Sequence, residues 1–178
     1  LLATATASTS ASLAFTAFDN STYDSYLFIG NNVRPVNDGV VFHFRTSSNG
    51  GSSYDSGASD YAWNAIARDT GNGANTVSSS GDLADSEIEI NSGSLSSELG
   101  NVAGEALNFK LTLYGAGNAN FTGCNFQWTG FETGGDFHMG QGGGVRLSAA
   151  DVDAATFLFS SGSITSGVIK MYGYKESV

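Results

Sequence analysis

Apolar and polar residues alternate with a period of two through most of this chain. The clearest case lies between positions 106 and 114, where the residues in order are Leu107, Asn108, Phe109, Lys110, Leu111, Thr112 and Leu113. A period of two places successive side chains on opposite faces of a strand, so that one face is buried and the other meets water. Helical periodicity is nearly absent, and the pattern therefore predicts an all-β protein.

Strand-like segments of this kind recur between turns. We expect about ten strands, from the segments 2–7, 12–16, 23–30, 40–45, 61–67, 75–79, 87–90, 106–114, 121–132, 136–147, 156–159 and 167–174. With 24 Gly and one Pro, the turns depend on Gly, Asn, Asp and Ser. The spacing predicts one antiparallel β-sandwich domain over residues 1–178, jelly-roll-like and with little helix. Residues 1–16 are expected to form an N-terminal strand segment that pairs with a neighbouring subunit.

The closing segment of the chain reads FLFSSGSITSGVIKMYGY. We interpret it as a β-hairpin, with Phe157 and Phe159 on the first strand and the turn at Gly167. The two Phe side chains are expected to help close the core. Lys170 and Tyr172 fall on the opposite strand face from the neighbouring apolar residues, where contact with another subunit is expected.

The charge balance excludes several partners. The net charge is −10, and the seven basic residues are scattered along the chain. Binding to nucleic acid requires clustered Lys and Arg to neutralise phosphates, so we expect no nucleic-acid partner. No apolar run approaches the roughly 20 residues of a membrane helix, so we expect no membrane insertion.

Cys124 has no second cysteine to pair with and is expected to be a small buried side chain.

Acidic residues cluster in three short stretches of the sequence. These contain Asp19, Asn20 and Asp24; Asp55, Ser56 and Asp60; and Asp151 and Asp153. Oxygen-rich loops of β-proteins can bind structural calcium, but none of these stretches matches the calcium-loop motif. Asp and Asn also form turns by hydrogen bonding to their own backbone. We expect turns and no cofactor, and structural calcium stays open as the alternative.

Candidate catalytic residues are few. His138 follows Asp136 by two positions, and Glu132 precedes the same turn, an arrangement that a hydrolase could use. His43 alternates with two Phe residues and is expected to face solvent or an interface. The chain contains neither a G-x-S-x-G nor an H-E-x-x-H motif. We therefore expect that the protein is not an enzyme.

Aromatic residues near polar, Gly-rich loops suggest a second class of function. Tyr61 and Trp63 share a strand face, and Trp128 lies in another strand-like segment. Flat rings of this kind can stack on sugars, so Tyr61, Trp63 and Trp128 are our candidate carbohydrate-binding residues. The other interpretation is that the rings pack in the core of the sandwich.

Several ordered stretches resemble a family of tailed-bacteriophage structural proteins, common in phages of aquatic bacteria and often described as tail-fibre, tail or minor structural proteins. The stretches are ATATASTSASLAFTAF and YDSYLFIGNNVRPVNDG near the start, FHFRTSSNGGSSYDSGASDYAW in the middle, and FLFSSGSITSGVIKMYGY at the end. Together they run from near residue 3 to residue 174. The resemblance implies a non-enzymatic β-sandwich on the exterior of a virion, usually within a homo-oligomer.

We therefore expect a structural protein on the outer surface of a bacteriophage virion, associated with the tail or decorating the capsid. Its expected partners are other copies of itself and other virion proteins. The alternative is a carbohydrate-binding module that recognises a glycan on the host surface. The resemblance carries over no catalytic residue.

Overall fold

The computed structural model describes residues 1–71, 76–92 and 98–175. These residues form strands, which are β1 (Ala3–Thr6), β2 (Leu13–Phe15), β3 (Ser25–Pro35), β4 (Phe42–Ser47), β5 (Tyr61–Asp69), β6 (Thr76–Asp85), β7 (Ile88–Glu89), β8 (Leu107–Tyr114), β9 (Gly123–Phe131), β10 (Phe137–Arg146), β11 (Ala154–Phe159) and β12 (Ile164–Tyr174). Each strand overlaps one of the segments expected from the alternating pattern. The predicted all-β fold is confirmed.

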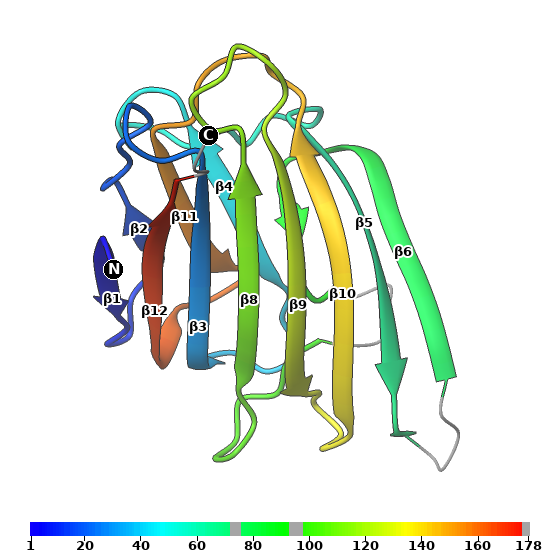
Figure 1. Cartoon of the computed structure of the whole chain (residues 1–178). Helices are drawn as coiled ribbons and strands as arrows, with labels where there is room; N and C mark the ends of the chain where they lie inside the picture. The colour runs from blue at the N-terminus through cyan, green and yellow to red at the C-terminus, as the bar shows by residue number, and fades with distance from the viewer. Residues whose placement is uncertain (72–75, 93–97, 176–178) are drawn as a thin grey trace.

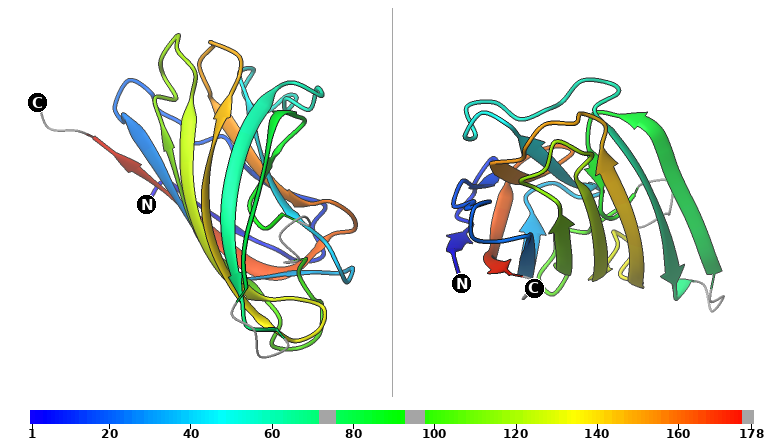
Figure 2. Two further views of the ribbon diagram at one scale, coloured as in Figure 1. Left: turned by 90° about the vertical axis from the view of Figure 1, so that its right-hand side faces the viewer. Right: turned by 45° about the horizontal axis from the view of Figure 1, so that its top comes forward.

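The strands form two antiparallel sheets that pack face to face as a sandwich (Figure 1). Sheet A has eight strands in the order β1-β12-β3-β8-β9-β10-β5-β6, and sheet B has four in the order β2-β11-β4-β7. Figure 2 shows the two layers from other directions, together with the twist of sheet A that right-handed strands impose. We call the side of sheet A turned away from sheet B its outer face.

A cluster of aromatic rings fills the space between the sheets. The ring of Phe157 on β11 lies within 5.0–6.1 Å, centroid to centroid, of five other Phe rings from both sheets: Phe15, Phe28, Phe42, Phe44 and Phe109. Phe157 itself is fully buried, and Phe159 is 3% exposed, as the alternation predicts. Burying one such side chain contributes roughly 1.5–3 kcal/mol, so this cluster adds substantially to the packing of the two layers.

The closing segment does not form the predicted hairpin. β11 pairs with β2 and β4 in sheet B, whereas β12 pairs with β1 and β3 in sheet A. The chain crosses between the sheets at residues 160–163, where Gly162 has a positive φ of 73°. Gly167, the expected turn, lies inside β12 at a register shift, also with positive φ. Because a period of two fixes faces and not partners, the pattern could not distinguish a hairpin from a crossing between layers.

The N-terminal segment pairs within its own chain in this structure. β1 adds to β12 at one edge of sheet A, with Ala3 opposite Met171. β2 adds to β11 at one edge of sheet B, with Leu13 opposite Phe157. Within the chain, both strands of residues 1–16 are thus paired on one side; pairing of this segment with a neighbouring subunit stays a prediction.

Candidate functional site

The three aromatic candidates for sugar binding, Tyr61, Trp63 and Trp128, lie in the core, as the other interpretation of these rings predicts. Tyr61 is fully buried, and Trp63 and Trp128 are 6% and 3% exposed. The hydroxyl of Tyr61 accepts a hydrogen bond from the Thr46 amide at 2.8 Å, and burial raises its pKa to about 12. Nε1 of Trp63 donates to Asp85 at 2.8 Å. No ring face of the three is exposed, so they offer no platform on which a sugar could stack.

The histidine and acids expected in a hydrolase do not come together. His138 is 1% exposed, and its closest carboxylate is that of Asp69 on β5, with Nε2 and Oδ1 3.4 Å apart. Glu132 instead accepts a hydrogen bond from the amide of Gly134 at 3.0 Å, within the turn between β9 and β10. In the described parts of the chain, no hydrogen bond or ion pair joins His138 to Asp136 or Glu132.

His43 is buried rather than facing solvent, so that prediction is wrong. It is 6% exposed, and its Nδ1 lies 3.7 Å from Oε1 of Glu87, whose other oxygen lies 2.6 Å from Arg45. Glu87 and Arg45 cover a side chain that alternation alone would place on an open face. Burial lowers the pKa of His43. Burial would raise the pKa of Glu87, but hydrogen bonds from Arg45 and Ser86 outweigh it and hold that pKa below its usual value.

The acidic stretches considered for calcium are engaged in turns and ion pairs. Asp19 accepts from the Ser21 hydroxyl at 2.6 Å, Asp60 from the Gly57 amide at 2.6 Å, and Asp153 from the Gly50 amide at 2.8 Å. Asp55 pairs with the buried Arg146, with Oδ2 and Nε 2.5 Å apart. Among the described residues, no group of three or more His, Cys, Asp or Glu side chains is placed to hold a metal ion.

Cys124 is buried on the inner side of β9, as predicted. Burial raises the pKa of its thiol to about 12. The thiol is therefore protonated and shielded at neutral pH, which suits an inert core side chain rather than a reactive one.

The outer face of sheet A brings together polar side chains that the sequence pattern did not single out. Cross-strand pairing aligns Lys110, Gln127, Gln141 and Ile66 in one row across β8, β9, β10 and β5. A second row contains Asn108, Thr129, Met139, Arg68 and Val77. A third contains Thr112, Asn125, Gly143, Asn64 and Gly81. Directly opposed residues on paired strands share a face, so the rows form one continuous surface.

Two depressions lie along these rows. One, of about 690 Å³, is lined mainly by the first two rows, and the other, of about 490 Å³, by the first and third. Both are lined by Ile66, Lys110, Gln127 and Gln141, so they form one open groove across the strands. We call this groove the trough. Each depression has a volume in the range of ligand-binding clefts, although the trough is open rather than enclosed.

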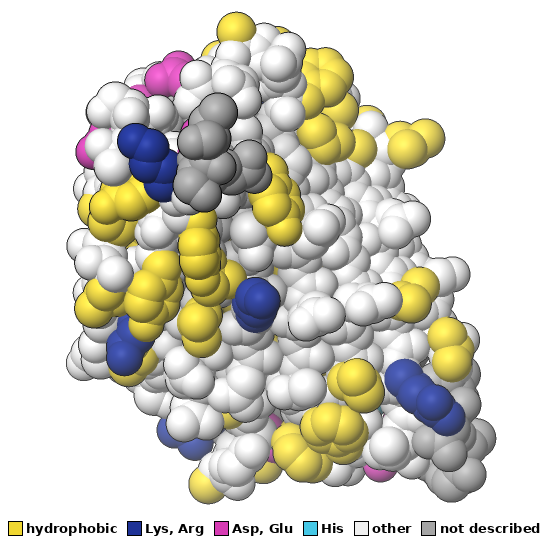
Figure 3. Space-filling view, in the orientation of Figure 1, with side chains coloured by type: hydrophobic (Ala, Val, Ile, Leu, Met, Phe, Trp, Pro, Cys, Tyr) yellow, Lys and Arg dark blue, Asp and Glu magenta, His cyan; other side chains and the backbone are white. Residues whose placement is uncertain are grey.

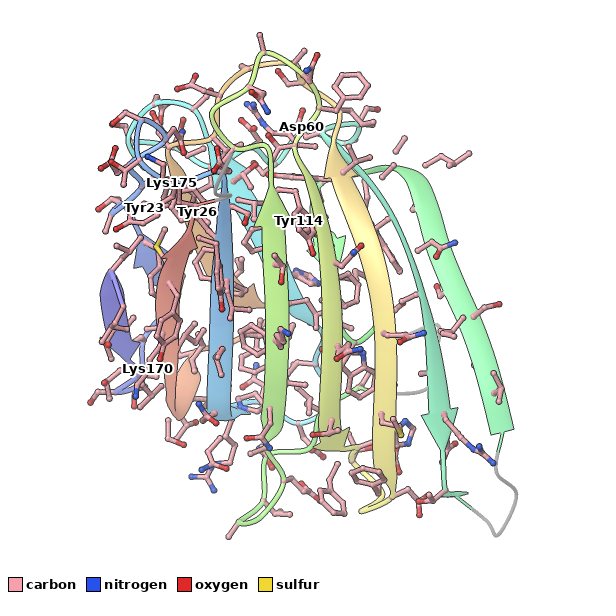
Figure 4. All side chains as sticks on the ribbon, viewed as in Figure 1. Tyr23, Tyr26, Asp60, Tyr114, Lys170 and Lys175 are labelled. Atoms are coloured by element: carbon pink, nitrogen blue, oxygen red, sulfur yellow. The ribbon has the colours of Figure 1, made fainter. Side chains whose placement is uncertain are left out.

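Acidic side chains are absent from the outer-facing positions of β3, β8, β9, β10 and β5. Asp69, the one carboxylate on these strands, falls on the inner side, where it meets His138. Figure 3 looks onto the outer face and shows acidic side chains only at its margins. Lys170 and Tyr114, labelled in Figure 4, lie on β12 and β8 of this sheet. The face is polar and weakly basic in a chain whose net charge is −10.

The free edge of sheet A at β6 is the second surface of interest. Among the described residues, β6 pairs with β5 on one side and no strand pairs with its other side. Its Val77 and Leu83 side chains are 67% and 87% exposed. Charges and proline usually protect an edge strand from pairing; β6 carries Asp82 and Asp85 near its end, but its stretch 76–80 has neither a charge nor a proline. The other edge strands, β1, β2 and β7, are two to four residues long.

No protein-family model matches this chain, and no curated protein sequence matches it. Among the described residues, no helix is long and apolar enough to span a membrane.

A sequence signal for the trough existed in the strand pattern. The polar positions of 106–114 and 123–131 carry Asn, Lys, Thr and Gln but no Asp or Glu, which is unusual in an acidic chain. Alternation identifies these positions as outward-facing. It does not show that they become neighbours of Asn64, Ile66 and Arg68, because that depends on the order of strands in the sheet.

Proposed function

We propose that this chain is a non-enzymatic structural protein of the exterior of a bacteriophage virion. It acts by associating with further copies of itself and with other virion proteins. The observation that carries the proposal is the long unpaired edge of sheet A at β6, with its exposed Val77 and Leu83.

The stretches that resemble phage structural proteins support the proposal because they pack together. They contribute β1, β12 and β3, which are consecutive in sheet A, β2, β11 and β4, which are consecutive in sheet B, and the first residues of β5 near the other edge of sheet A. The rings of Phe15, Phe28, Phe44 and Phe157 connect these strands. Segments far apart in the sequence thus form most of one half of the sandwich.

An edge strand of this kind offers backbone donors and acceptors to a strand of a second chain. Val77 and Leu83 add apolar surface that would be removed from water on pairing. An edge with two exposed apolar side chains would make a subunit contact of modest area. Many copies of this contact on one particle would strengthen the association through avidity. Positions on the tail and on the capsid are both compatible with this edge.

The location is tested on intact virions of the phage whose genome encodes the chain. Gold-labelled antibody against the purified protein is expected to decorate the outside of the particles, and the decorated part distinguishes tail from capsid. An antibody against the major capsid protein serves as the positive control. Particles that carry none of the chain, with all of it free in the lysate, would contradict the proposal.

A further inference from the structure

We propose that the trough on the outer face of sheet A binds an acidic polysaccharide in which uncharged sugars separate the carboxylates. Lys110 and Arg68 supply the positive charges. The side-chain amides of Asn64, Gln127 and Gln141 hydrogen-bond the sugar hydroxyls. This inference does not depend on self-association, since the trough lies within one chain.

Charge is the first reason for this ligand. The chain has 17 acidic and seven basic residues, so most of its surface repels a polyanion. The outer face of sheet A does not repel a polyanion in this way. The outward positions of its strands β3, β8, β9, β10 and β5 hold Lys110 and Arg68 and no carboxylate. An acidic polymer is therefore directed to this face and away from the rest of the molecule.

The polar groups of the trough are the second reason. In the part of the chain that the structure describes, no hydrogen bond engages the side-chain amides of Asn64, Gln127 or Gln141, and no carboxylate pairs with Lys110. An amide offers both donors and an acceptor, which matches the hydroxyls of a sugar. The amides project from central strands of a wide sheet, so binding need not order a loop.

Apolar side chains complete the trough. Ile66 and Met139 are 45% and 49% exposed and line the larger depression beside the polar row. They offer contact to the C–H faces of sugar rings without the stacking that aromatic residues provide. Gly143 has no side chain, and the side-chain oxygen of its row neighbour Asn125 would lie 3.1 Å from a Cβ at that position.

Nucleic acid fits this face poorly. Lys110 and Arg68 are three strands and one row apart, which is about 15 Å at the usual strand spacing. Duplex DNA carries a charge about every 1.7 Å, and its binding needs many clustered cations. A polymer with widely spaced carboxylates matches two separated cations better. A protein partner fits less well, because the three rows carry no aromatic side chain of the kind that enriches the centres of protein interfaces, and Tyr114 is the one exposed aromatic among the described residues that line the trough.

Calorimetric titration of the chain with a panel of polysaccharides tests the inference. The acidic probes are hyaluronate, gellan and xanthan, and the neutral probes are dextran and pullulan. We expect at least one acidic probe to bind, with affinity that falls as salt is raised, and the neutral probes to bind more weakly.

The variants Lys110→Ala and Gln127→Ala are each expected to weaken that binding about tenfold or more. Lys175→Ala is the matched control, because it removes an exposed charge that lies beyond β12, away from the trough. It is expected to bind like the wild type, and thermal melting checks that all three variants fold.

Three results would overturn the inference. One is that no acidic polysaccharide binds. Another is that Lys175→Ala weakens binding as much as Lys110→Ala does, which would indicate a non-specific charge effect. The third is that Lys110→Ala and Gln127→Ala change the mass of an oligomer while no polysaccharide binds, which would make the face a contact between copies of the chain.

Discussion

The indole of Trp128 on β9 lies against the backbone of Gly140 on β10. A Cβ placed on residue 140 would come within 2.7 Å of Nε1 and Cε2 of Trp128. The same strand accommodates Phe126 over Gly142 and Ile88 over Gly144. Gly140, Gly142 and Gly144 thus face inward and leave room for large side chains of the core, whereas Gly143 faces outward in the third row of the trough.

Gly140→Ala is expected to destabilise the fold by about 1–3 kcal/mol, the usual cost of overpacking a core. The added methyl would meet Trp128 and also the backbone oxygen of Ile66, at 2.8 Å, which cannot rotate away. Gly123→Ala on β9 is the control, because its Cβ would meet only an atom 3.8 Å away. Urea denaturation measures both. Equal stability of Gly140→Ala and the wild type would show that the indole does not occupy this position.

Asp55→Asn is expected to cost about 1–3 kcal/mol of stability, because it leaves the buried guanidinium of Arg146 without its carboxylate. This loss of stability is smaller than for a fully buried ion pair, because the Asp55 side chain is 29% exposed. Arg146 also donates to Ala150 and Ser48, so the loss should loosen the loops at that end of the sandwich. Asp38→Asn, in an exposed loop, is the control. Ordinary surface substitutions change the free energy of unfolding by less than about 0.5 kcal/mol. A change that small for Asp55→Asn would contradict a stabilising ion pair between Asp55 and Arg146.

His43 is expected to make stability depend on pH near neutrality. Burial lowers its pKa below the usual 6.5, so the folded state binds a proton less tightly than the unfolded state does. Its contribution is therefore complete above the unfolded pKa and is lost as the pH falls below it, by up to about 1.4 kcal/mol per pH unit.

His43→Gln removes this titration, and the difference is measured as unfolding free energy between about pH 7.5 and 5.5. Glu87, whose pKa is lowered, stays ionised across that window. Burial raises the pKa of Glu89, so this group changes stability with pH in the opposite direction. That effect is the same in the wild type and in His43→Gln and cancels in the difference. If the two proteins lose stability in parallel as the pH falls, the buried neutral state of His43 is wrong.

The strands were predictable from the sequence, but their partners were not. Leu107, Phe109, Leu111 and Leu113 face the core as the alternation predicts. Alternation is a local property and depends on sheet geometry alone. The pairing of β12 with β3 and of β11 with β4 depends on contacts more than 100 positions apart in the chain. No local pattern distinguishes those contacts from a hairpin.

The environments of the candidate site residues were also not predictable from the local sequence pattern. Trp128 could be exposed or buried on the sequence pattern, and its burial is decided by Gly140 on the adjacent strand. His43 occupies an alternate position that should be open, but Glu87 and Arg45 cover it. In each case a neighbour from another strand determines the environment. The trough was missed for that reason also.

The most direct test of assembly through the β6 edge is the mass of the chain in solution. Light scattering after size exclusion, at micromolar concentrations, is expected to give a multiple of the 18.4 kDa chain mass. Val77→Lys with Leu83→Lys places charges on the β6 edge and is expected to shift the protein toward the monomer. Val102→Lys, at a loop position 59% exposed, should leave the oligomer intact. A wild-type monomer at every concentration, or an oligomer that the β6 substitutions leave unchanged, would contradict assembly through this edge.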